Sequence, residues 1–136
     1  MATEPTLTHQ LILFRGTDWH RGLSPEELQG TMSRWNSWIE DLVNTGKLIS
    51  GHPLANSGKL VSGKKATVSD GPFAESKEAI GGYLLLKVAD FDEAVNIAQN
   101  CPALPHGLEV EVRPIVPICP VAQAAQMTYE PAAALA

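Results

Sequence analysis

Two short segments of this 136-residue chain are apolar at nearly every position, and they constrain the fold more than any other feature. Residues 11–14 read Leu-Ile-Leu-Phe, and residues 83–88 read Tyr-Leu-Leu-Leu-Lys-Val. Side chains alternate between the two faces of a strand, so a strand of this composition has to be covered on both sides. The fold therefore needs a sheet with two covered faces.

A helix is predicted soon after the first of these strands. Ser24 and Glu27 have the spacing of a capping box, and the proline between them suits the first helical turn. Apolar residues then recur every three or four positions and form one stripe along the helix, at Leu28, Met32, Trp35, Ile39 and Leu42. Trp38 is expected at the border of this stripe, and Gly46 is a natural C-terminal end for the helix.

The remaining elements complete an alternating order. We predict a strand at 47–51, a hairpin joining 60–61 to 65–69, a helix from Asp90 to Pro102 and a strand at 108–113. This order predicts an α+β, ferredoxin-like βαββαβ fold, in which split βαβ units flank a central hairpin and both helices cover one sheet face. We expect residues 1–8 to be a lead-in, 9–115 to be one domain and 116–136 to be a Pro- and Ala-rich arm.

Helices on one face leave the other face uncovered. A second copy packed sheet against sheet would cover it and give a homodimer, a dimeric α/β barrel. The last strand alternates cleanly: if Val110 and Val112 meet the helices, then Glu109, Glu111 and Arg113 face the partner and line a polar cavity. The alternative is that these charged residues are simply solvated.

The densest run of turn formers and ionisable groups lies at residues 68–83. In a cavity, Asp70 beside apolar Phe73 would have a raised pKa and could serve as a general base. The alternative is a turn aspartate that caps its own backbone. Glu75 and Lys77 are candidates for substrate contacts, or simply members of the first turn of a short helix.

Three residues outside this corner are also candidates for a site. His52 could act as an acid or base, or pair with Asp70, but a histidine satisfied within its loop is the plainer alternative. Arg113 would suit an anionic substrate through bidentate contacts, or else pair with Glu109 or Glu111 at the surface. His20 lies in the loop before the first helix. We predict no metal site and no cofactor, because these residues do not show the spacing of a ligand set.

Composition narrows the class of protein further. The net charge is -5 and the basic residues are scattered, which argues against nucleic-acid binding. No apolar run approaches the ~20 residues of a membrane span. Two cysteines make neither a disulfide framework nor a zinc site. Without a leader pattern at the start, we expect a cytoplasmic protein.

The corner resembles a known family. Residues 70–78 read Asp-Gly-Pro-Phe-Ala-Glu-Ser-Lys-Glu and residues 81–83 read Gly-Gly-Tyr, which is similar to the DGPF subgroup of the YCII-related family. Similarity also covers the segments 24–27, 51–54, 92–94 and 109–114. The resemblance implies the dimeric α/β barrel fold.

The same resemblance implies little about activity. Members are mostly uncharacterised, and some occur beside or fused to extracytoplasmic-function sigma factors. Better-understood relatives resemble small-molecule lyases that use a His and an Asp, whereas this chain has no histidine in residues 24–45 and has Cys101 in place of that Asp. Two functions therefore stay open: a cofactor-free lyase or isomerase using Asp70 or His52 with Arg113, and a non-catalytic ligand-binding or regulatory module.

Overall fold

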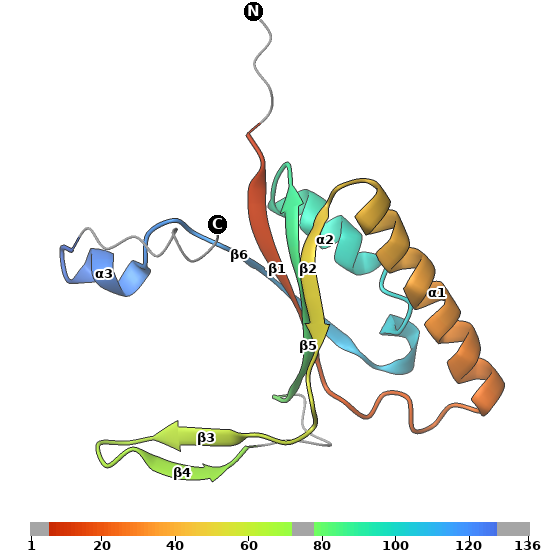
Figure 1. The fold of residues 1–136 in the computed structure, drawn as a ribbon, viewed down its shortest axis with the longest axis horizontal. Coiled ribbons are helices and arrows are strands. Elements are labelled where there is room, and N and C mark those ends of the chain that lie inside the picture. The colour runs from red at the N-terminus through yellow and green to blue at the C-terminus, as the bar shows by residue number, and fades with distance from the viewer. Residues whose placement is uncertain (1–5, 72–77, 128–136) are drawn as a thin grey trace, which may run out of the picture.

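A computed structural model describes residues 6–71 and 78–127, and it places a four-stranded antiparallel sheet at the centre (Figure 1). The strand order is β2-β5-β1-β6. The sheet strands are β1 (Thr8–Arg15), β2 (Leu48–Pro53), β5 (Ile80–Val88) and β6 (Glu109–Pro114). The α+β class and the antiparallel sheet are confirmed, and the order is compatible with the predicted ferredoxin-like fold.

Two helices, α1 (Pro25–Asn44) and α2 (Phe91–Gln99), cover one face of this sheet, and a short turn, η1 (Leu104–His106), follows α2 (Figure 1). The core lies between the helices and the sheet. Strand residues Ile12, Leu86 and Val88 are almost completely buried there, together with Ala94 of α2. Burial of these side chains supplies most of the driving force for this layer to form.

Helix α1 begins as the sequence predicts, but its buried side is rotated. The Ser24 hydroxyl accepts from the Glu27 backbone N–H, and the Glu27 carboxylate accepts from the Ser24 N–H, so the capping box is confirmed. Trp38 is buried rather than at the border, whereas Met32 is 40% exposed rather than in the stripe. The reason is that the Trp38 indole Nε1 donates to the Ile97 carbonyl at 3.3 Å, which lets the large ring be buried against α2 with its polar atom satisfied.

In the described part of the chain, no helix packs on the opposite face of the sheet, and we call this the open face. Strand β6 places Val112 opposite Ile12 and Val110 opposite Phe14, and both valines pack against the helix-side core. Alternation then puts Glu111, the neighbour of Leu13, on the open face. Strand β6 therefore has the orientation in which its valines meet the helices and its charged side chains lie on the open face, where a partner could contact them.

The hairpin forms, but it is not part of the central sheet. Among the described strands, β3 (Lys59–Ser62) and β4 (Thr67–Asp70) pair with each other and with no third strand, and every residue of both is exposed. The hairpin and the short helix α3 (Pro120–Ala124) project on the side of the sheet away from α1 and α2 (Figure 1). An isolated two-stranded hairpin is marginally stable, so this one needs a further contact.

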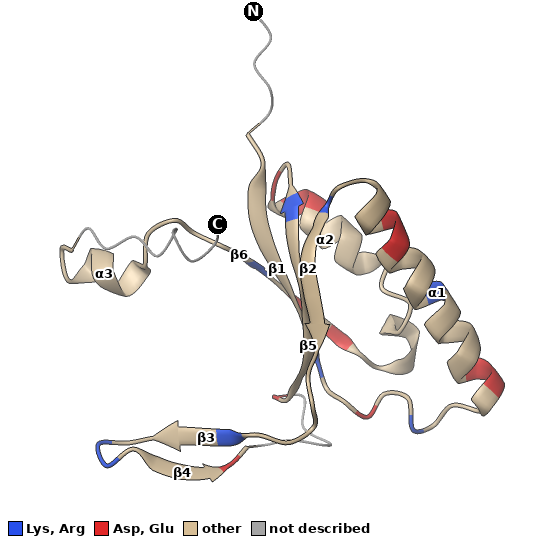
Figure 2. Cartoon of the chain, in the orientation of Figure 1, with Lys and Arg blue, Asp and Glu red and all other residues tan. Residues whose placement is uncertain are grey.

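Charged residues are spread over the helices, the strands and the hairpin instead of gathering in one patch (Figure 2). Within residues 6–71 and 78–127, no helix is long and apolar enough to cross a membrane.

Candidate functional site

A cavity of about 550 Å³ lies between α1 and the end of the sheet that β2 borders. The loop before α1 closes one side of the cavity, and the first residues of β5 close another. Its walls are rich in aromatic and small residues, and its lining includes Phe14, Trp19, His20, Met32, Trp35, Asn36, His52, Asn56, Gly82 and Tyr83. A concave, largely apolar space with a few polar groups is what small-molecule sites have in common.

The aromatic wall of this cavity is built from three elements. Trp35 of α1 packs on Phe14 of β1 with ring centroids 5.0 Å apart. Trp19, from the loop before α1, stacks on Trp35 with centroids 6.5 Å apart and planes 6° apart. These contacts fix the rings relative to one another, so the wall is preorganised for a flat or apolar ligand.

Two glycines let the strands at the cavity approach each other closely. A Cβ on Gly51 would lie 2.6 Å from Leu84 Cδ2 and 3.0 Å from the Tyr83 carbonyl oxygen. A Cβ on Gly82 would lie 3.0 Å from the His52 carbonyl oxygen. Side chains larger than hydrogen at these positions would push β2 away from β5.

His52 and Tyr83 form a polar pair at this edge of the sheet. They are cross-strand partners on β2 and β5, and His52 Nδ1 lies 2.8 Å from the Tyr83 hydroxyl. Gly82 and Leu84 are buried on the helix side, so alternation puts the Tyr83 ring on the open face. If Nδ1 accepts from the phenol, the proton of the neutral ring is on Nε2; if Nδ1 instead donates to the phenol oxygen, Nε2 is a free base that can accept a proton.

At the other edge of the open face, three charged side chains are joined. Arg15 Nη1 donates to one oxygen of the Glu111 carboxylate at 2.6 Å, and Arg113 Nη1 donates to the other at 3.1 Å. These two guanidinium groups hold the pKa of Glu111 below its usual value of 4.5. Arg113 keeps most of its donor groups directed to solvent, since its side chain is well exposed.

The structure does not bring all the predicted site residues together. Asp70 lies on the hairpin, its side chain is 82% exposed, and it pairs with Lys59. His52, which the sequence offered as a partner for Asp70, pairs instead with Tyr83 because both lie on the central sheet while Asp70 does not. Phe73, Glu75 and Lys77 lie outside the described residues.

Sequence reasoning placed His20 and His52 near a site but missed the residues that complete it. Trp19 and Trp35 form the wall, and Tyr83 gives His52 its hydrogen-bond partner. The sequence does contain a signal for Tyr83: within residues 83–86 it carries a side-chain hydroxyl, whereas the three residues after it are leucines. In the part of the chain that the structure describes, no three His, Cys, Asp or Glu side chains gather as a metal site would need.

Comparison with known proteins gives a match to one family model and a short match to one curated protein. The family model of the YCII-related domain matches residues 11–118. A protein of Rhizobium meliloti (strain 1021), described as uncharacterized, is 45% identical over 49 residues. The match covers 35% of this chain and 40% of that relative, so it spans less than half of either.

Proposed function

This chain belongs to the YCII-related domain family, and on that premise we propose that it is a homodimeric, cofactor-free enzyme of the lyase or isomerase type. Its reaction takes place in a chamber that forms when the open faces of two copies meet as a dimeric α/β barrel. The His52–Tyr83 pair carries this proposal, because it places a titratable nitrogen and a phenol 2.8 Å apart on that face.

In this proposal His52 moves the proton. Its Nε2 takes a proton from a carbon or oxygen atom of the substrate and returns it to a neighbouring atom or to a leaving group. Tyr83 fixes the imidazole and its tautomer through Nδ1. Positioned general acids and bases contribute roughly 100-fold to 10,000-fold to a rate.

Arg113 holds an anionic group of the substrate. The Glu111 carboxylate is shared by two guanidinium groups, those of Arg15 and Arg113, and the Arg113 side chain is 68% exposed. A carboxylate of the substrate can then bind the free edge of the Arg113 guanidinium through two parallel hydrogen bonds. The exposed position of Asp70 on the hairpin suits a contact with the second copy better than a role in proton transfer.

Three features support the dimer. Leu11, Leu13 and Leu85 are half-buried on the open face. The hairpin and α3 both project beyond this face (Figure 1). A second copy related by a two-fold axis would cover the leucines and give the hairpin the contact that it lacks. The corner at residues 70–83 supports placing the chain in the DGPF subgroup.

Exchange of carbon-bound hydrogen tests the enzyme proposal before the substrate is known. We would incubate the protein in D₂O with a panel of 2-oxo and 3-oxo acids and follow loss of the proton next to the carbonyl by NMR. We expect at least one acid to exchange with wild type, and exchange to fall at least 100-fold in His52→Asn. Ser50→Ala, two residues earlier on β2, is the matched control and should retain exchange. No exchange above the His52→Asn level for any acid would contradict an acid/base role for His52.

A ligand-binding or regulatory module, working with an extracytoplasmic-function sigma factor, is the second candidate. The cavity under α1 favours it, because none of its described lining residues is Asp, Glu, Lys or Arg. Such a wall binds a neutral aromatic or apolar ligand without chemistry. Binding of indole, followed by backbone amide shifts in NMR spectra, should weaken in Trp19→Ala, and unchanged shifts of wild type on adding indole would count against this function.

A further inference from the structure

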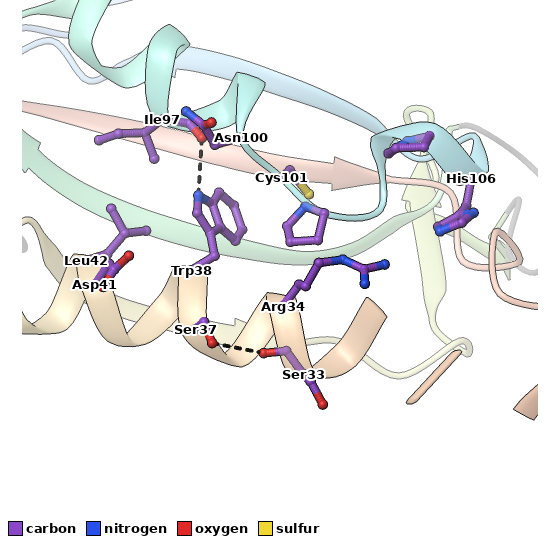
Figure 3. Close-up of a pocket in the computed structure, with 12 residues that line it drawn as sticks. Ser33, Arg34, Ser37, Trp38, Asp41, Leu42, Ile97, Asn100, Cys101 and His106 are labelled. Atoms are coloured by element: carbon purple, nitrogen blue, oxygen red, sulfur yellow. Dashed lines mark hydrogen bonds between the residues drawn. The ribbon is translucent and has the colours of Figure 1, made fainter. Parts of the chain in front are cut away.

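A second hollow lies on the outer side of the helix layer, away from the open face of the sheet. It is a groove of about 820 Å³ between α1 and the segment that runs from the end of α2 into η1. Figure 3 shows the side chains that line it. They are Ser33, Arg34, Ser37, Trp38, Asp41, Leu42, Ile97, Asn100, Cys101, Pro102, Pro105 and His106. The proposed enzyme chemistry does not use this groove.

One end of the groove carries cationic and hydrogen-bonding groups that converge on Thr31. This threonine is completely buried, and its hydroxyl donates to the Glu27 carbonyl at 2.9 Å. Its oxygen must therefore act as the acceptor for Arg34 Nη2 at 3.2 Å and for His106 Nε2 at 3.1 Å. These two contacts fix Arg34 and His106 side by side, and they assign the Nε2–H tautomer to a neutral His106.

The charge of Arg34 is not neutralised by a protein carboxylate in the described part of the chain. There Arg34 donates to the neutral Thr31 hydroxyl, which uses one of the five N–H donors of a guanidinium. Glu27 lies near His106, but its carboxylate accepts from the Ser24 N–H in the capping box. The remaining N–H donors of the Arg34 guanidinium can therefore bind the anionic group of a ligand.

The other end of the groove is acidic, and the floor between the ends is apolar. Asp41 follows Arg34 by seven residues on α1, which is two helical turns and about 10 Å along the axis. Figure 3 shows Asp41 beside Leu42 at one end, with Arg34 and His106 toward the other. Between them lie the Trp38 ring and buried Cys101, and Pro102 also lines the groove.

We propose that this groove binds a small organic acid with an extended apolar body. Its carboxylate binds Arg34 and the His106 end, its apolar chain lies over Trp38 and Pro102, and an amine at its far end binds Asp41. The spacing of the two charges selects for length: a chain much shorter than about 10 Å cannot reach both ends. The site is separate from the His52–Tyr83 pair, so it can be occupied whether or not that pair is catalytic.

Binding of three matched probes tests the site. We would titrate the full chain with octanoate, ω-aminooctanoate and the neutral octanamide, and follow backbone amide shifts by NMR. We expect ω-aminooctanoate to bind most tightly, octanoate more weakly and octanamide least, with the largest shifts at residues 33–41 and 97–106. Arg34→Gln should weaken binding of both acids about tenfold, which corresponds to the loss of one charge-assisted hydrogen bond.

Two further variants separate this site from non-specific binding. Asp41→Asn should weaken ω-aminooctanoate toward the affinity of octanoate and leave octanoate itself unchanged or slightly tighter. Lys64→Gln, in the turn of the exposed hairpin, removes one positive charge outside the groove and should change neither acid. Equal affinity of wild type and Arg34→Gln for both acids, or shifts confined to other residues, would overturn the proposal. Loss of exchange in His52→Asn with unchanged probe binding would show that the two sites are independent.

Discussion

At the scale of single residues, the cluster of Arg15, Glu111 and Arg113 shows how neighbouring side chains determine the pKa of a carboxylate. Glu111 alternates with Val110 and Val112, so its place on the open face follows from the strand period. Its two arginine partners come from different places: Arg113 from the same strand and Arg15 from β1. The first contact is local, whereas the second exists only because β1 and β6 pair.

The cluster predicts a pH dependence of stability. The pKa of Glu111 is lowered by hydrogen bonds to Arg15 and then Arg113, from a usual value of 4.5. A lowered pKa in the folded state means that the carboxylate adds stability above about pH 4.5, and that this stability is lost as pH falls through the folded pKa. The urea midpoint of wild type should therefore drop between about pH 5 and about pH 3 by more than that of Glu111→Gln.

Glu109→Gln, on the same strand, is the matched control for this prediction. No ion pair is recorded for Glu109 in the described part of the chain, so its substitution should preserve the wild-type pH dependence. Parallel curves for wild type and Glu111→Gln would contradict the stabilising role of the cluster.

At the scale of elements, the pairing of β2 with β5 determines whether the cavity and the His52–Tyr83 pair can form. The strands approach closely at Gly51, where they leave no room for a Cβ beside the Tyr83 backbone. This explains why a glycine lies just before His52. Because Gly51 lets β2 approach β5, the adjacent His52 can lie opposite Tyr83.

Gly51→Ala should therefore destabilise the protein by about 1–3 kcal/mol, the usual cost of forcing extra volume into a packed region. The variant should also weaken indole binding, because β2 lines the cavity. Gly22→Ala, where a Cβ meets nothing within 4 Å, is the matched control and should be neutral or slightly stabilising. Chemical denaturation of both variants gives the comparison, and equal midpoints would show that β2 moves aside without cost.

At the scale of the whole molecule, the open face, the hairpin and α3 form a surface that one copy leaves uncovered. The hairpin exposes Leu60, Val61 and Val68, at 48%, 66% and 60%. Exposed apolar residues on a hairpin that pairs with no other strand in the described part of the chain are typical of a subunit interface.

Val61→Asp with Val68→Asp should therefore weaken dimerisation at least tenfold while leaving the central sheet folded, because both valines lie outside the sheet core. Truncation after Ile115, which removes the arm, should act in the same direction. Sedimentation at several concentrations measures both effects. Val43→Asp, at a 56% exposed position on α1, is the control and should leave the dimer unchanged. A monomeric wild type would contradict the shared chamber and the active site within it.

The sequence alone determined those features that depend on neighbours in the chain. The capping box at Ser24, the start of α2 at Asp90 and the alternation on β6 all follow from residues within a few positions of one another. The family resemblance at the corner likewise pointed to the YCII-related domain that the family model matches.

Only the tertiary structure decided which distant residues meet. His52 pairs with Tyr83 rather than Asp70 because β2 joins the central sheet while β4 leaves it, and strand pairing across 31 residues has no local signature. Trp38 is buried because α2 offers a carbonyl to its indole, a contact that no helical period encodes. Local patterns fix elements and their faces, whereas packing and long-range hydrogen bonds select the partners that make a site.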